Sequence, residues 1–97
     1  MRLLKFTFNA FQENTYILYD DKNQDETQGI IIDPGISNQN EWEEVMEALE
    51  VHSIDLHSIV LSHGHIDHIL GIHRLLEWRP SMPIYGHKIT QEVLNAQ

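Results

Sequence analysis

The sequence contains no cysteine and no long run of apolar residues. In a chain of 97 residues, zero cysteines exclude disulfides and every zinc site that uses thiolate ligands. No stretch approaches the roughly 18 consecutive apolar residues of a membrane-spanning helix. The N-terminus lacks the apolar core and small-residue cleavage site of a secretory signal. We therefore expect a cytoplasmic protein with no membrane partner.

Basic residues are also scarce. Six lysines and arginines stand against fifteen aspartates and glutamates, so the formal net charge is −9. This charge argues against nucleic acid as a partner, because its phosphates attract basic surfaces. The hydrophobic content of 41% and the charged content of 22% are typical of a globular protein. The length predicts a single domain over residues 1–97.

Strand-like and helix-like segments alternate along most of the chain. Apolar, β-branched runs bounded by turn residues predict strands over residues 4–8, 15–19, 29–32, 57–62 and 83–85. Helical spacing predicts a helix over residues 37–50, with Ser37 or Asn38 as its N-cap and an apolar stripe of Trp42, Val45, Met46 and Leu49. It also predicts a helix over residues 67–78 and a weaker one over residues 87–96. The continuous apolar strand 29–32 is expected to be buried on both faces, and the polar run 20–28 to be a hairpin tip. This pattern predicts an α/β fold with a mixed sheet.

The strongest chemical signal is the 63–68 motif, His63-Gly64-His65-Ile66-Asp67-His68. In an extended segment His63 and His65 point to one side, while Asp67 and His68 are adjacent where a helix would begin. Imidazole and carboxylate are ligands that zinc accepts readily. Two pairs of ligands suit two neighbouring metal ions, each of which needs further ligands from elsewhere.

Several of these polar residues also have a structural interpretation. Asp67 alone could be a helix N-cap, but that role leaves three histidines at these spacings unexplained. Asp33 before Pro34 is interpreted first as a turn residue. The remaining histidines are expected at the surface or at helix caps: His52, His57, His73 and His87. Among these, His87 is the best candidate for an extra metal ligand.

The motif and its flanks resemble those of the metallo-β-lactamase-fold hydrolases, and most of all their glyoxalase II-like branch. Three further segments support the resemblance. These are Asn14-Thr15-Tyr16, the stretch Ile31-Ile32-Asp33-Pro34-Gly35, and Gly71.

This resemblance implies the N-terminal half of a four-layer αββα sandwich, with a mixed sheet and helices on one face. It implies that His63 and His65 hold one zinc ion, and that Asp67 and His68 hold a second. Asp67 would also act in catalysis by orienting the attacking water. The substrate would be a small thioester or similar acyl compound. By the same resemblance the remaining ligands come from beyond the matched region, and one sheet face packs on a partner sheet.

Three other functions are alternatives at this point. The chain could be a non-catalytic metal-binding or assembly half-domain, completed as a homodimer or by a complementing C-terminal half. A di-iron relative is disfavoured because, by family resemblance, that branch has glutamate where this chain has His65. A nuclease relative shares the motif but is disfavoured by the net charge of −9.

Overall fold

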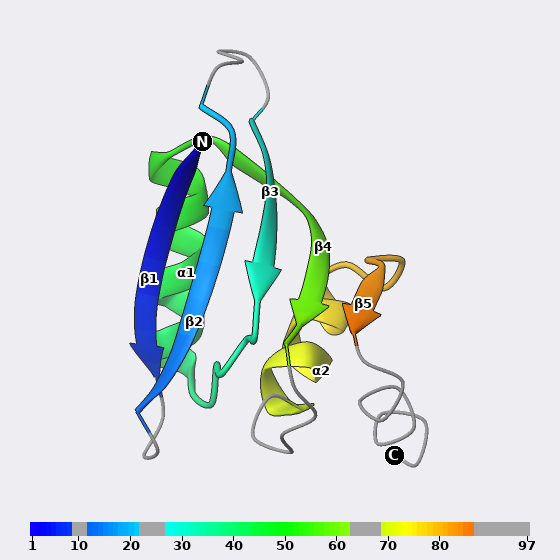
Figure 1. Cartoon of the computed structure of the whole chain (residues 1–97). Coiled ribbons are helices and arrows are strands. Elements are labelled where there is room, and N and C mark those ends of the chain that lie inside the picture. The colour runs from blue at the N-terminus through cyan, green and yellow to red at the C-terminus, as the bar shows by residue number, and fades with distance from the viewer. Residues whose placement is uncertain (9–11, 22–26, 63–68, 87–97) are drawn as a thin grey trace.

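The computed structural model describes residues 1–8, 12–21, 27–62 and 69–86. In these ranges five strands form one sheet in the order β1-β2-β3-β4-β5 (Figure 1). The elements in chain order are β1 (Arg2–Phe8), β2 (Glu13–Tyr19), β3 (Thr27–Ile32), α1 (Gln39–Val51), β4 (Ile54–Leu61), α2 (Ile69–Trp78) and β5 (Ile84–Gly86).

The sheet changes from antiparallel to parallel at β3. Strands β1, β2 and β3 pair antiparallel, whereas β3, β4 and β5 pair parallel. Each parallel step needs a crossover, and α1 and α2 provide the two crossovers. Both steps move in the same direction across the sheet, so right-handed crossovers place both helices on the same face. Figure 1 shows α1 behind β1 and β2.

The core lies between the sheet and the two helices. Alternate strand residues point toward the helices, since side chains along a strand change face at every position. Ile17, Ile31 and Ile59 are completely buried on three neighbouring strands. From the helix side Val45 and Leu75 are equally buried. The amphipathic spacing predicted from the sequence therefore builds one shared core.

Helix α1 begins where the sequence placed its cap. The Asn38 side chain accepts a hydrogen bond from the Glu41 backbone N–H at 2.9 Å, which satisfies one of the free amides of the first turn. Val45 and Leu49 are buried, and Trp42 and Met46 pack against the core. The expected apolar stripe is confirmed.

The other face of the sheet carries apolar side chains that no described helix covers. We call it the open face. Cross-strand pairing places Leu3, Leu18 and Ile30 in one row, and Tyr16, Ile32, Val60 and Tyr85 in the next. Leu3 is 57% exposed and Tyr85 56% exposed, and the five residues between them are half-buried: Tyr16, Leu18, Ile30, Ile32 and Val60.

The predicted α/β mixed sheet is confirmed, with differences in burial and in strand bounds. Strand 29–32 is not buried on both faces, because its Ile30 and Ile32 lie on the open face. Strand β4 starts at Ile54 rather than at residue 57, since Ile54–Leu56 also pair with β3, before a register shift between Gly29 and Ile30. The expected helix over residues 87–96 and the first two residues of the helix over 67–78 lie outside the described residues. No described helix is long and apolar enough to cross a membrane.

Candidate metal centre

The carboxyl ends of β3 and β4 lie side by side in the parallel part of the sheet. Ile32 pairs with Val60, and the Asp33 backbone N–H continues the ladder by donating to the Val60 carbonyl at 2.9 Å. The 63–68 motif follows β4 directly in the sequence. Sites in α/β folds collect at the carboxyl edge of parallel strands, and Ser62, the residue before the motif, lies at this edge.

Asp33 holds the residue that precedes the motif. Its carboxylate accepts from the Ser62 backbone N–H at 2.7 Å and also from the Ser62 hydroxyl. Asp33 is only 6% exposed, and hydrogen bonds to a buried charged acceptor are stronger than neutral ones. Asp33 thus fixes the backbone one residue before His63.

Thr15 holds the turn that Asp33 begins. Its hydroxyl donates to the Asp33 carbonyl and accepts from the Gly35 backbone N–H, both at 2.8 Å. Thr15 is fully buried on β2. Both hydrogen-bonding roles of one buried hydroxyl are therefore used to shape residues 33–35.

Gly71 in α2 lies against the same turn. A Cβ atom on Gly71 would come within 2.3 Å of the Pro34 carbonyl oxygen and 3.1 Å of the Ile36 nitrogen. Both neighbours are backbone atoms, which cannot move aside as a side chain can. Glycine is needed here for close approach, and it lets the first turns of α2 pack on the end of β3.

The predicted ligands themselves, His63, His65, Asp67 and His68, lie outside the described residues, as does His87. Their metal-binding roles stay predictions. Elsewhere in the described chain, no group of three histidine, aspartate or glutamate side chains could hold a metal ion.

The other three histidines are exposed, as expected. His52 is the C-cap of α1, and its Nδ1 lies 3.3 Å from the Tyr19 hydroxyl. Asp33 ends β3 in the turn that the sequence favoured, and its carboxylate in addition bonds to Ser62, the residue before the motif.

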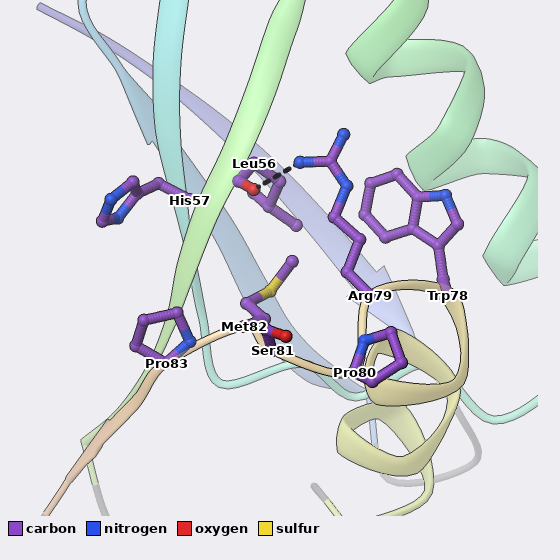
Figure 2. A pocket seen from close by; sticks show the side chains of 8 residues that line it. All are labelled: Leu56, His57, Trp78, Arg79, Pro80, Ser81, Met82 and Pro83. Carbon is purple, nitrogen blue, oxygen red and sulfur yellow. Dashed lines mark hydrogen bonds between the residues drawn. The ribbon is translucent and has the colours of Figure 1, made fainter.

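A surface cavity of about 420 Å³ opens beside the first half of β4 (Figure 2). Arg79 crosses it, donating to the Leu56 carbonyl at 3.0 Å and to Asp55 at 2.6 Å while covering the Trp78 ring. From Leu56 to Ser62 a strand extends roughly 20 Å. None of the residues that line the cavity belongs to the Asp33 turn, and Ser62 is not among them.

Sequence reasoning did not single out two residues of this region, Ser62 and the hydroxyl of Thr15. Thr15 was noted only as part of a family segment. A hydroxyl within or directly after an apolar strand was the signal that could have found them. A buried hydroxyl needs a hydrogen-bond partner, so such a residue indicates a specific contact.

A family model described as "Metallo-beta-lactamase superfamily" matches residues 8–96. The chain belongs to this superfamily. A B3 metallo-beta-lactamase, BLEG-1, has a similar structure with a TM-score of 0.74 and 26% sequence identity. The match covers 96% of this chain and 40% of BLEG-1. The sheet and its two crossover helices are thus those of a metallo-β-lactamase fold.

Similar curated proteins are named hydroxyacylglutathione hydrolase. The one from Pectobacterium carotovorum subsp. carotovorum is 37% identical over 84% of this chain and 29% of its own length. The one from Salmonella arizonae is 37% identical over 86% of this chain and 30% of its own length. The chain spans under a third of these relatives, and the glyoxalase II-like resemblance predicted from the sequence is confirmed.

Proposed function

We propose that this chain is the metal-binding half of a zinc-dependent hydrolase that acts on a thioester or similar acyl substrate. One observation carries the proposal. A motif of three imidazoles and a carboxylate follows the carboxyl end of β4, and the residues on both sides of it pack on the Asp33 turn. The names of the relatives, hydroxyacylglutathione hydrolase, support an acyl substrate.

The donor set of the motif fits zinc, because imidazole and carboxylate are ordinary zinc ligands and the chain has no cysteine. We assign His63 and His65 to one ion and Asp67 and His68 to another. Asp67 would in addition accept a hydrogen bond from the attacking water and so orient it. A bound zinc ion would supply Lewis acidity toward water and the substrate carbonyl.

The proposal includes a partner that completes the fold. The chain spans 29% to 40% of relatives and of the solved structure, and its open face presents two apolar rows. Exposed apolar patches of this kind mark interaction sites. We assign the open face to the complementing C-terminal half of such a hydrolase. Cytoplasmic location and the lack of a nucleic-acid partner remain predictions from composition.

The metal assignment is tested by titrating Zn²⁺ into the full 97-residue chain against a chromophoric chelator, with elemental analysis after dialysis. We expect the variant His65→Ala to bind zinc at least about 10-fold more weakly, since it removes a ligand. The matched control is His73→Ala, which removes an exposed imidazole on α2. Equal affinities for the wild type and His65→Ala would contradict the assignment.

Hydrolysis is tested separately, with simple thioesters and the zinc-loaded chain mixed with the C-terminal part of a relative. We expect turnover that needs both polypeptides and is lost in His65→Ala. Zinc binding without turnover would favour the second candidate, a non-catalytic assembly half-domain. The open face supports that candidate, and a zinc content that rises with self-association would be its signature.

A further inference from the structure

Helix α2 ends beside the cavity of Figure 2, and Arg79, the residue after that end, is held in one orientation. Its Nη1 donates to the Asp55 carboxylate at 2.6 Å and to the Leu56 carbonyl at 3.0 Å. Its Cζ lies 4.3 Å from the centroid of the Trp78 ring. Two hydrogen bonds and one cation–π contact therefore fix the guanidinium in place before any ligand binds.

One edge of this guanidinium has no hydrogen-bond partner within the part of the chain that the structure describes. A guanidinium carries five N–H donors, and both hydrogen bonds of Arg79 come from Nη1. The Nε and Nη2 groups, which share one edge of the planar group, remain available. Such an edge presents two parallel N–H bonds, which a carboxylate accepts with both of its oxygens. The Arg79 side chain is 42% exposed, so it is open to a ligand.

The cavity beside Arg79 has mainly apolar walls, formed by Leu56, Trp78, Pro80, Met82 and Pro83. Leu56 and Met82 are buried, so they offer an apolar surface below the exposed prolines. The volume of about 420 Å³ lies within the usual range of small-molecule sites. The cavity thus combines apolar walls with one charged group, which is typical of sites that bind small amphipathic molecules.

The loop that forms one wall of the cavity is preorganised. The Met82 N–H donates to the Arg79 carbonyl at 3.1 Å and closes a turn with Pro80 at its second position, where the fixed φ of proline is favoured. The Pro83 carbonyl accepts from the Ile59 N–H at 2.9 Å and so joins the loop to β4. A preformed site loses little conformational entropy when a ligand binds.

We infer that this cavity and the Arg79 edge form a binding site for a small carboxylate with an apolar body. The apolar body occupies the cavity, and the carboxylate accepts hydrogen bonds from Nε and Nη2 of Arg79. The site uses no metal and no residue of the 63–68 motif, so the inference does not rest on the proposed function.

Asp55 limits the affinity of this site. Its carboxylate bonds to the same guanidinium and repels a second anion, although its side chain is 49% exposed and solvent screens part of the repulsion. The variant Asp55→Asn keeps an oxygen that can accept from Nη1 and removes the negative charge. We therefore expect this variant to bind a carboxylate more tightly than the wild type does.

The first test compares benzoate with benzamide, which has a similar shape and no charge. The metal-free 97-residue chain is titrated in the presence of a chelator, so that zinc cannot hold the carboxylate. Nitrogen-15 NMR should show benzoate shifting the Arg79 Nε–H signal and the amides of Ser81 and Met82. Benzoate should bind at least about 10-fold more tightly than benzamide. Equal binding of the two compounds, or benzoate shifts that do not saturate, would overturn the inference.

The second test uses matched variants, each checked for folding by circular dichroism. Arg79→Lys keeps the charge but removes the two-donor edge, and should weaken benzoate binding by about 10-fold. The control is Arg74→Lys, because Arg74 also lies over a tryptophan, 5.2 Å from the centre of the Trp42 ring, but does not line the cavity. It should leave the affinity unchanged.

Asp55→Asn should bind benzoate about threefold more tightly, the size of effect expected of one exposed charge. A folded Arg79→Lys variant with wild-type affinity for benzoate would disprove the role of the Arg79 edge. If Arg79→Lys does not fold, the benzamide comparison and Asp55→Asn decide, and weaker or unchanged benzoate binding in Asp55→Asn then counts against the site.

Discussion

At the scale of single residues, Asp33 is the most informative position. Its backbone takes a left-handed conformation that ends β3, and aspartate tolerates this better than most residues do. Its buried carboxylate meanwhile joins β3 to the end of β4 through Ser62. Asp33 thus ends β3 and also fixes the chain just after β4. A small acidic side chain suits this position because it tolerates the left-handed backbone and accepts both bonds from Ser62.

Charged pairs at the surface behave differently, as Arg2 and Asp21 show. The Arg2 side chain donates to Asp21 at 2.7 Å, and this hydrogen bond holds the pKa of the Asp21 carboxyl below its ordinary value. A lowered pKa in the folded state contributes stability above the unfolded-state pKa, and the contribution is lost as the pH falls through the folded-state pKa. The gain is small because both groups are exposed.

The residue-scale prediction concerns this pair. In a carbon-detected NMR titration, the pKa of Asp21 should rise toward the ordinary aspartate range when Arg2 is changed in Arg2→Ala. Asp55 is the internal control, since it pairs with Arg79 instead. An Asp21 pKa that is the same in both proteins would show that Arg2 does not cause the shift.

At the scale of elements, the two helices are joined to each other and to β4 by aromatic and cationic side chains. Trp42 of α1 and Trp78 of α2 meet edge to face, with ring centroids 5.9 Å apart. Arg79 lies 4.3 Å from the Trp78 ring centre and bonds to Asp55. These contacts stabilise the packing in addition to the burial of apolar area, since aromatic pairs and cation–π pairs are each favourable in their own right.

The element-scale prediction concerns the start of α1. Asn38→Ala removes the N-cap hydrogen bond and should lower the free energy of unfolding by about 1 kcal/mol. Urea denaturation followed by circular dichroism measures the change. The control is Asn40→Ala, which makes the same substitution inside the helix. Alanine is the better helix former there, so no loss of unfolding free energy is expected. Equal losses in both variants would rule out a capping role.

At the scale of the whole molecule, the two faces of the sheet differ. One face is covered by α1 and α2, and the open face carries the rows that contain Leu18 and Ile32. Apolar side chains left in water favour association, because their burial gains roughly 25 cal/mol per Å². The isolated chain is therefore expected to associate through the open face until a complementing half covers it.

The prediction at this scale compares two lysine substitutions at exposed apolar positions. Leu3→Lys places a charge on the open face, where Leu3 is 57% exposed, and should reduce self-association at unchanged stability. Val51→Lys also places a charge at an exposed apolar position, at the end of α1, where Val51 is 68% exposed. It should leave self-association unchanged. Sedimentation velocity over a concentration series distinguishes them, and equal effects would place the association elsewhere.

Much of the fold could be predicted because it depends on local patterns. The alternation in β2 and the apolar stripe of α1 follow from the periods of strands and helices. The Asn38 cap follows from the short polar side chain that a helix start favours. The prediction that strand 29–32 is buried on both faces is wrong, because a continuous apolar run does not tell whether a helix or a partner covers each face. Four strands start two or three residues before their predicted starts, since pairing with a neighbour extends a strand beyond its apolar part, and β5 starts one residue after its predicted start.

What the sequence determined by itself is the chemistry and its approximate place. Ligand type, ligand spacing and the end of an apolar strand can be read locally, and together they point to a metal motif in a metallo-β-lactamase-like chain. Only the tertiary structure decided that Asp33 bonds to Ser62 across 29 positions, that a Cβ atom at Gly71 would overlap the Pro34 carbonyl, and that no described helix covers one face of the sheet. These facts depend on which strands pair and in which register, and such long-range contacts leave no periodic trace in the residues that make them.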